Sequence, residues 1–305
     1  MDAWAVRRLS EDAILPTAGS ENAAGYDLSV VHDLIIKPHD IGVARTDLEI
    51  NLLCQDSYMR ITGRSGRTIR QHLHVVEGII DNDNHGEIKI SIINHSGVDV
   101  KIRKGERVAQ AICEKIARPK IIEVANRTSI SSFPNSELLL YKKLSTQACT
   151  PTKRRQSSAG FTLYSAVEAH IGPLGKIDIK TDIAVKPPTG TYCRIAPLLS
   201  TMPYQNITTE AGVIDEDYRG NIKVILFNHS RRAVHINQGD KIAVLICEKI
   251  GNPIIFESPR LDATDRGSQG LGSSGIAPIY ETKEEIKESM KNLDAIEESM
   301  RNLWL

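Results

Sequence analysis

The sequence predicts an all-β protein built from two tandem jelly-roll barrels, followed by a flexible glycine-rich arm and a C-terminal amphipathic helix. Three observations support this fold class. The chain repeats itself, each repeat contains short Val- and Ile-rich segments of alternating polarity, and Gly, Asn or Asp turns bound those segments. Many short strands at this spacing indicate a closed or sandwiched antiparallel sheet.

The repeat is visible as a set of matched segments. The offset between copies is 135 residues in the early matches (9 to 144) and 134 in the later ones (78 to 212). An offset this constant indicates a tandem duplication. The matched pairs are 9–17 with 144–152, 24–26 with 159–161, 78–88 with 212–222, 93–96 with 227–230, and 112–116 with 246–250.

Each copy is expected to hold its own barrel, because 305 residues suit two domains better than one. The clearest strands are EIKISI and VDVKI in the first copy, and NIKVIL and AVHI in the second. We place copy one at residues 1–120, a linker at 121–137, and copy two at 138–259.

Two segments lie outside the repeat. Residues 260–280 are rich in Gly and Ser, which predicts a mobile arm. Residues 281–305 carry apolar side chains at helical spacing among Glu and Lys, which predicts an amphipathic helix. Its stripe spans only about two heptads, so docking on a barrel and dimerisation both remain open. The stripe comprises Ile286, Met290, Leu293, Ile296, Met300 and Leu303.

Composition restricts partners and compartment. Acidic and basic residues balance at 38 each, which argues against nucleic acid as the ligand. The five cysteines are scattered without a CxxC pair, as in a reducing compartment. No apolar run is long enough to span a membrane. We expect an intracellular protein, cytoplasmic and/or nuclear.

Two local patterns are weak signals. The run Lys153-Arg154-Arg155 suits a solvated turn better than a nuclear localisation signal. His72 and His74 lie two residues apart without the further ligands that a zinc site needs.

Three short motifs are intact only in copy one. AAGYDL carries Asp27, where copy two has Thr162. GRSG carries Arg64, Ser65 and Gly66, where copy two reads PLLS. GERVAQA carries Gln110, where copy two has Val244. Copy two has therefore lost the polar residue of each motif.

Two other motifs are best formed in copy two. GVIDEDYRG carries Asp215 and Tyr218, whereas copy one keeps Asp81 but has Asn84 and His85 in place of Tyr-Arg. The glycine-rich stretch RGSQGLGSSG begins at Arg266, and the matching stretch of copy one has lost its glycines. The two sets are complementary, which indicates that one hybrid site is maintained.

In this order the motifs resemble those of the trimeric deoxyuridine triphosphatase (dUTPase) family, over nearly all of residues 4–275. The resemblance implies jelly-roll barrels, active sites shared between subunits, and hydrolysis of dUTP to dUMP and pyrophosphate. With two barrels per chain, the simplest expected assembly is a monomer with one hybrid site. Larger assemblies through the terminal helix remain open.

The resemblance also implies roles for these residues. Asp215 is expected to be the general base, and Asp27 to orient a water of a Mg²⁺ ion held by the phosphates. Tyr218 would lie under the deoxyribose and exclude a 2′-hydroxyl, while the backbone of Gly212, Val213 and Ile214 would bind uracil. The expected phosphate-binding residues of copy one are Arg64, Ser65, Gly66 and Gln110. Those expected from the arm are Arg266, Gly267, Ser268, Leu271, Gly272 and Ser273.

The arm departs from the family pattern, because Leu271 replaces an aromatic that would stack on uracil and Gln269 replaces a glycine. Losing that contact is expected to weaken binding by up to about tenfold.

Two alternatives to the hydrolase stay open. One is a catalytically inactive relative that serves as a binding or regulatory module, and the other is a related deoxycytidine triphosphate deaminase, which the GVIDEDYRG motif disfavours.

Overall fold

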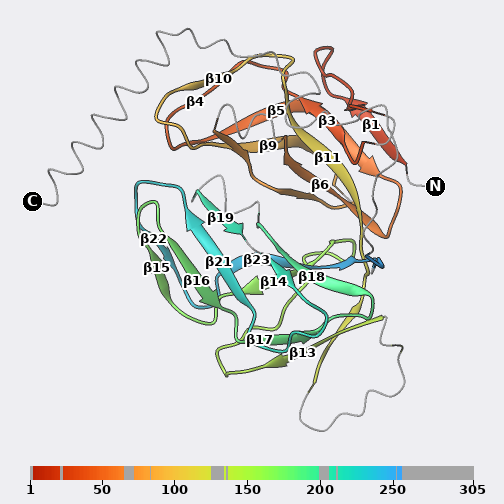
Figure 1. Ribbon diagram of the computed structural model, residues 1–305, viewed down its shortest axis with the longest axis vertical. Coiled ribbons are helices and arrows are strands. Elements are labelled where there is room, and N and C mark those ends of the chain that lie inside the picture. Colours follow the sequence, from red (N-terminus) through yellow and green to blue (C-terminus); the bar gives the residue numbers. More distant parts are fainter. Residues whose placement is uncertain are drawn as a thin grey trace, which may run out of the picture. The chain divides into compact units, whose positions relative to one another are not determined.

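The fold is described from a computed structural model, and every regular element it contains among the described residues is a β-strand (Figure 1). The structure describes residues 3–20, 23–64, 72–82, 84–124, 134, 137–198, 206–210, 212–251 and 253–255. The predicted arm and terminal helix, at 260–280 and 281–305, lie outside these ranges. Within the described part of the chain, no helix has the length and apolar character needed to cross a membrane.

Copy one forms two larger sheets that enclose a core. One sheet has the order β1-β5-β9-β7 and the other β2-β3-β11-β6-β8, with β10-β4 as a small third sheet. The strands are β1 (Trp4–Arg8), β2 (Thr17–Ala18), β3 (Tyr26–Ser29), β4 (Leu34–Ile36), β5 (Ile41–Leu52), β6 (Ser57–Gly63), β7 (Leu73–Val75), β8 (Gly78–Ile80), β9 (Glu87–Asn94), β10 (Val100–Ile102) and β11 (Arg107–Lys115).

Copy two repeats this arrangement. Its sheets have the orders β12-β13-β17, β14-β23-β18-β20, β16-β21-β19 and β15-β22. The strands are β12 (Lys120–Glu123), β13 (Leu138–Lys143), β14 (Phe161–Tyr164), β15 (Ala169–Ile171), β16 (Lys176–Lys180), β17 (Ile183–Lys186), β18 (Thr191–Ala196), β19 (Ile207–Glu210), β20 (Val213–Ile214), β21 (Lys223–Asn228), β22 (Val234–Ile236) and β23 (Lys241–Lys249).

Alternating side chains fill a separate hydrophobic core in each copy. In β9 the burial pattern alternates at Ile88, Ile90 and Ile92, which are fully enclosed, while Lys89 faces out. This period of two is what a strand with one buried face requires. One core belongs to copy one and the other to copy two, so the predicted all-β fold of two jelly-roll barrels is confirmed.

The repeated Asn-His-Ser motif has a structural role in both copies. The Asn94 side-chain amide donates to the carbonyls of Ile36, Lys37 and Val98, at 2.7–3.2 Å. Asn228 donates in the same way to three carbonyls of copy two. A buried amide that satisfies three backbone carbonyls fixes the loop beside it, which explains why both copies carry the motif.

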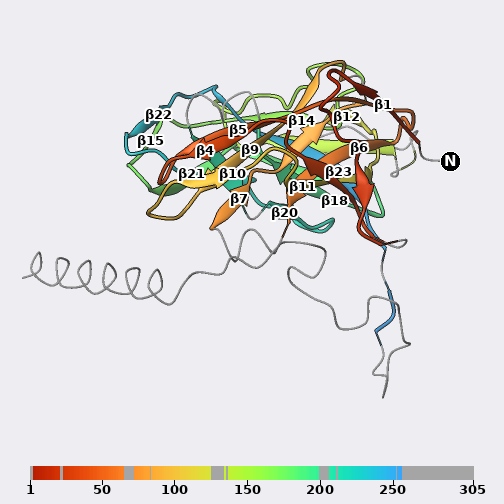
Figure 2. The same ribbon diagram turned by 90° about the horizontal axis from the view of Figure 1, so that it is seen from above.

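Strand β12 belongs to copy one by repeat position but pairs with copy two. It runs parallel to β13, with Lys120 opposite Leu138 and Glu123 opposite Tyr141. Ile121 packs against the core of copy two. The strand begins at Lys120, the last residue expected for copy one, and its pairing joins it to a sheet of copy two. Figure 2 labels β12 in the view from above.

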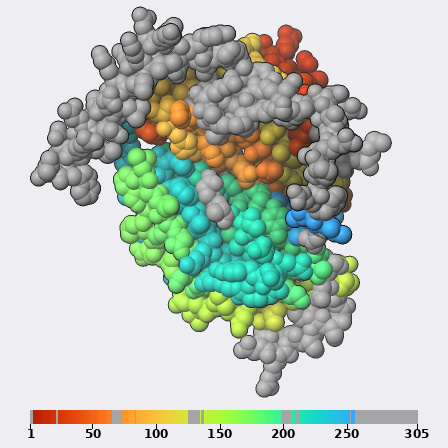
Figure 3. Space-filling view, viewed as in Figure 1, coloured from red at the N-terminus to blue at the C-terminus, as the bar shows by residue number. Residues whose placement is uncertain are grey.

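The two copies share a third, smaller core. Tyr58 and Ile116 of copy one are fully buried against Ala159, Ala196 and Ile246 of copy two. In the space-filling view, atoms of copy one (red to yellow) lie directly against those of copy two (green to blue) (Figure 3).

Beside this core, a buried ionic network joins the copies. Arg194 donates to Glu248 at 2.6 Å and to Glu77 of copy one at 2.7 Å, while Tyr58 donates to Glu248 at 2.5 Å. Burial acts to raise the pKa of Glu248, but Arg194 and the hydroxyls of Tyr192 and Tyr58 together lower it. The carboxylate therefore stays ionised in the interface.

Candidate functional site

The structure brings the intact motifs of copy one together around a buried carboxylate. Asp27 lies on β3, and its Oδ1 is 3.0 Å from Nε of Arg64. Its Oδ2 is 3.2 Å from Nη1 of Arg107. Asp27 and Arg64 are each only 8% exposed. Two guanidinium groups therefore flank one carboxylate, and such groups are strong donors to the oxygens of phosphates and other anions.

Strand pairing explains this cluster. Strand β11 lies between β3 and β6, and its Gln110 stands opposite Asp27 on one side and Thr62 on the other. The Gln110 amide donates to the Gly63 carbonyl at 3.3 Å, next to Arg64. Motifs that are far apart in sequence therefore meet because three strands are adjacent.

Arg107 was missed in the sequence analysis. Its signal was present, since it is the charged residue inside the GERVAQA motif, and copy two has Lys241 at the same repeat position. The structure shows that its side chain reaches Asp27, at a point where the register of β11 shifts between Arg107 and Ala109.

Asp27 is also the residue that the family resemblance links to a magnesium ion. Both of its oxygens already hold an arginine, so it has no oxygen free of a cationic neighbour to serve as a direct ligand. Its remaining lone pairs can accept from a water, and magnesium keeps several waters in its shell. The cluster therefore fits the predicted water-mediated role and does not fit direct coordination.

The Asp215 motif forms a short strand and a turn in copy two. Strand β20 pairs with β18, with Val213 opposite Arg194 and Ile214 opposite Cys193. The turn closes where the Tyr218 N–H donates to the Asp215 carbonyl at 3.2 Å. Asp215 and Tyr218 are exposed on this turn, where a ligand can reach them.

Two glycines in this motif have no room for a side chain. A Cβ on Gly212 would lie 2.2 Å from the Ile195 carbonyl oxygen, so β20 can approach β18 only with glycine there. A Cβ on Gly220 would meet the Tyr218 ring and hydroxyl at 2.4–2.6 Å. The Tyr218 hydroxyl donates to the Asn221 carbonyl at 3.1 Å, so the tyrosine lies over the glycine.

Within the chain, the copies meet through their degenerate motifs. Asp81, the counterpart of Asp215, accepts a hydrogen bond from the Ala159 N–H at 2.7 Å. Ala159 begins the degenerate AGFTL motif of copy two. No contact joins Asp27 or Arg64 to Asp215 among the interactions recorded for residues 3–255 outside the gaps.

A pocket of about 250 Å³ marks this degenerate pairing. Thr162, Leu198 and Val244 stand here where copy one has Asp27, Arg64 and Gln110, so this pocket lacks the polar residues of those three motifs. Its lining comprises Ile79, Asp81, Asn84, Arg154, Arg155, Ser158, Gly160, Thr162, Pro197, Leu198 and Val244.

Several predicted site residues lie outside the described part of the chain. These are Ser65 and Gly66 of copy one and the arm residues Arg266, Gly267, Ser268, Leu271, Gly272 and Ser273. Their roles stay predictions.

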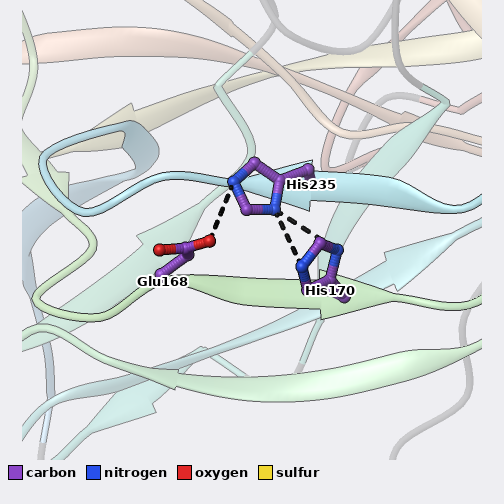
Figure 4. A group of neighbouring side chains, drawn as sticks. All are labelled: Glu168, His170 and His235. Carbon is purple, nitrogen blue, oxygen red and sulfur yellow. Dashed lines mark hydrogen bonds and ion pairs between the residues drawn. The ribbon is translucent and has the colours of Figure 1, made fainter.

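A second group of potential metal ligands lies away from these motifs. His170 on β15 stands opposite His235 on β22, their ring nitrogens 3.2–3.3 Å apart, and Glu168 is 3.4 Å from His235 (Figure 4). Within the part of the chain that the structure describes, this is the group of three side chains able to hold an ion together. His72 and His74 do not belong to it.

Comparison with known proteins gives the family. The sequence model of the dUTPase family matches residues 11–135 and again residues 146–275. A probable deoxyuridine 5′-triphosphate nucleotidohydrolase of Schizosaccharomyces pombe is 46% identical over 135 residues, which cover 44% of this chain and 96% of that protein. The deoxyuridine 5′-triphosphate nucleotidohydrolase of Arabidopsis thaliana is 42% identical over 164 residues, covering 54% of this chain and 99% of the relative.

Two further similarities are partial. The human mitochondrial deoxyuridine 5′-triphosphate nucleotidohydrolase is 46% identical over 137 residues, and the match spans about half of its length, 54%. A Staphylococcus bacteriophage 80alpha dUTPase solved with dUPNHPP is 25% identical, with a TM-score of 0.43, covering 45% of this chain and 98% of that one. Because the sequence model of the family matches residues 11–135 and again residues 146–275, the chain belongs to the dUTPase family and carries the family's domain twice.

Proposed function

We propose that the chain hydrolyses dUTP to dUMP and pyrophosphate at a hybrid site, with the triphosphate bound by copy one and the general base supplied by copy two. The single observation that carries the proposal is the cluster of Arg64 and Arg107 around the buried Asp27, a carboxylate that copy two lacks. Family membership and the names of the relatives support the choice of substrate.

Copy one would hold the phosphates in place. The guanidinium groups of Arg64 and Arg107 supply charge-assisted donors for phosphate oxygens, and the amide of Gln110 lies beside them. Because Asp27 fixes both arginines, the cations are oriented before the ligand arrives. Such preorganised charge stabilises a phosphoryl-transfer transition state more than flexible surface charge does.

Asp215 would take the proton of the attacking water. The water oxygen bonds to the α-phosphorus, the bond from the α-phosphorus to the bridging oxygen breaks, and pyrophosphate leaves with that oxygen. The exposed carboxylate on the β20 turn is accessible to such a water. Asp81 would not take this role, because it faces the pocket in which Thr162, Leu198 and Val244 replace the polar residues of copy one.

Recognition of the nucleoside would come from the same turn. The Tyr218 ring is 43% exposed and lies over Gly220. It would lie flat against the deoxyribose and exclude a 2′-hydroxyl by a steric clash. The backbone of Gly212, Val213 and Ile214 would supply hydrogen bonds to uracil. A narrow pocket of backbone groups rejects larger bases.

The arm and the metal complete the proposal. Arg266, Gly267 and Ser268, with Leu271, Gly272 and Ser273, would cover the ligand as a lid. When bound, Mg²⁺ supplies charge neutralisation on the triphosphate. Asp27 would orient one of the waters of that ion.

The test is release of pyrophosphate from each deoxynucleoside triphosphate in the presence of Mg²⁺. We expect release from dUTP alone, abolished by Asp215→Asn and largely spared by Asp81→Asn. The second variant is a matched control, because Asn keeps an acceptor for the Ala159 N–H. Equal loss in both variants would contradict the hybrid site. No release from any nucleotide would favour the inactive binding module.

A further inference from the structure

We propose that copy two carries a site for a divalent transition-metal ion of the Zn²⁺ type, held by His170, His235 and Glu168. The two histidines lie on neighbouring strands of the two-stranded sheet β15-β22, and the carboxylate precedes β15 (Figure 4). The ion links the two strands on the side that faces solvent. This site lies within copy two alone and does not depend on the hydrolysis proposed above.

The pairing of the two strands sets the histidines side by side. Strands β15 and β22 are antiparallel, and His170 stands directly opposite His235. Side chains directly opposite in an antiparallel pair project from the same face of the sheet. Both histidines are exposed, whereas Ile171 and Ile236, next to them in the strands, are buried. The buried isoleucines therefore anchor the two strands so that both rings face solvent together.

The distance between the rings matches that of a chelating pair. Nδ1 of His235 lies 3.3 Å from Nδ1 and 3.2 Å from Nε2 of His170. Zinc binds imidazole nitrogen at about 2.0–2.1 Å, so two such ligands at a tetrahedral angle are about 3.3 Å apart. An ion can therefore bind both rings without a movement of the backbone.

Hydrogen bonds beside His235 direct its Nδ1 lone pair toward the ion. The Asn237 amide nitrogen donates to the Asp240 carboxylate at 3.2 Å, which leaves the amide oxygen facing His235. That oxygen only accepts, and it lies 3.0 Å from Nε2 of His235, so Nε2 carries the proton of the neutral ring. Nδ1 then holds the lone pair, and it faces His170. Histidines that bind metals in proteins typically donate their other N–H to an oxygen in this way.

Glu168 supplies the third ligand. One of its carboxylate oxygens lies 3.4 Å from Nε2 of His235, and one ligand atom from each of the three residues lies within 4.8 Å of the others. The Glu168 side chain is 68% exposed, so it can turn toward the ion without displacing packed neighbours. Two imidazoles and one carboxylate form a known zinc ligand set that leaves a fourth position for water.

Copy one has a different arrangement at the same place in its fold. Ile35 and Lys101 stand opposite each other in β4 and β10, at the positions of the two histidines. Asp33 occupies the position of Glu168, and its Oδ2 lies 2.8 Å from Nζ of Lys101. A lysine ammonium therefore neutralises the carboxylate in copy one. Copy two has a carboxylate as well, but with two metal-binding side chains beside it, as expected if an ion supplies the positive charge.

The donor set selects the class of metal. Imidazole nitrogens suit Zn²⁺, Cu²⁺ and Ni²⁺, whereas Mg²⁺ prefers oxygen ligands and keeps several of its waters. A site with two imidazoles and one carboxylate therefore binds Zn²⁺ even in an excess of Mg²⁺. The ion of this site thus differs in kind from the Mg²⁺ that would accompany a bound triphosphate.

Binding of the ion stabilises the folded chain. His170 and His235 are 65 residues apart in sequence, so the complete site exists only when β15 and β22 are paired. A ligand that binds the folded state alone raises the free energy of unfolding, and the gain grows with the concentration of the ligand.

Isothermal titration calorimetry of the metal-free full chain with ZnCl₂, in excess Mg²⁺ and without nucleotide, tests the site. We expect Zn²⁺ to bind at one site per chain and to raise the melting temperature. His170→Ile and His235→Lys give copy two the residues that copy one has at these positions, so the strands can still pair. Each should abolish both effects. Glu168→Gln should weaken binding by about 10- to 100-fold.

His95→Gln is the matched control. The His95 ring also lies near two other histidines, with centroids 5.9 Å from His74 and 5.5 Å from His229, so its loss tests whether any group of histidines would serve. This variant should bind Zn²⁺ as the wild type does. No binding by the wild type, as expected if the two rings only share a hydrogen bond, would overturn the proposal. Full binding by both His170→Ile and His235→Lys, or an equal loss in His95→Gln, would also overturn it.

Discussion

The carboxylate of Asp81 in copy one accepts the backbone N–H of Ala159 in copy two at 2.7 Å. This contact joins the third motif of one copy to the first motif of the other, and both motifs are degenerate. The duplication has therefore kept the contact between domains while the chemistry of that particular pairing was lost.

Replacing Arg64 with Leu gives copy one the residue that copy two has at this position. The change removes a cation that Asp27 orients toward the proposed phosphates. We expect kcat/KM for dUTP to fall by roughly 10²–10³-fold, the usual loss for one preorganised donor. Steady-state kinetics measure this, and Leu198→Arg in copy two is the control expected to have little effect. A full rate in Arg64→Leu would exclude copy one as the phosphate site.

Replacing Gly220 with Ala tests the position of Tyr218. The new Cβ would meet the tyrosine hydroxyl at 2.4 Å and displace the ring. We expect a higher KM for dUTP and weaker discrimination against UTP. The control is Gly86→Ala at the matching position of copy one, where the nearest atom, Oδ1 of Asn84, is 3.9 Å away. Steady-state kinetics with dUTP and UTP measure both effects. The same KM and the same discrimination in Gly220→Ala and Gly86→Ala would contradict the role assigned to Tyr218.

Replacing Arg194 with Met should destabilise the contact between the copies. Arg194 is the cation between Glu77 and Glu248, and its side chain is only 11% exposed. Leaving Glu248 buried without that partner is expected to cost about 3–5 kcal/mol of unfolding free energy. Urea denaturation measures the loss. Arg45→Met, at an exposed ion pair, should change stability by less than about 1 kcal/mol.

Stability should fall at acid pH because of His229, which lies against His95 of the other copy with ring centroids 5.5 Å apart. Burial first, then His95 and His74, lower the pKa of His229 to about 4, from 6.5 in an unfolded chain. Between these values the unfolded state binds a proton that the folded state does not. This part of the stability is therefore complete above pH 6.5 and is lost as pH falls toward 4.

Thermal unfolding across that range checks the effect of His229. His229→Gln should flatten the dependence between pH 6.5 and 4, whereas substitution of the exposed His85 should not. An unchanged slope in His229→Gln would assign the acid sensitivity to other groups.

The sequence alone determined the duplication, the all-β fold and the division of motifs between copies. These are local or pairwise patterns: strand period, turn residues, and the identity of aligned positions such as Asp27 against Thr162. Asp27, Arg64 and Gln110 could be grouped in advance because all three belong to motifs that only copy one keeps intact, although their meeting depends on β11 lying between β3 and β6.

Only the tertiary structure decided which copy faces which. The complementary motifs favour one pairing of the copies, but the sequence cannot distinguish a contact within a chain from one between chains. The buried Ile116 and the exposed Ile250 have the same residue type and the same repeat position. Their difference comes from the rotation between the domains, a long-range property of packing that no local pattern of residues encodes.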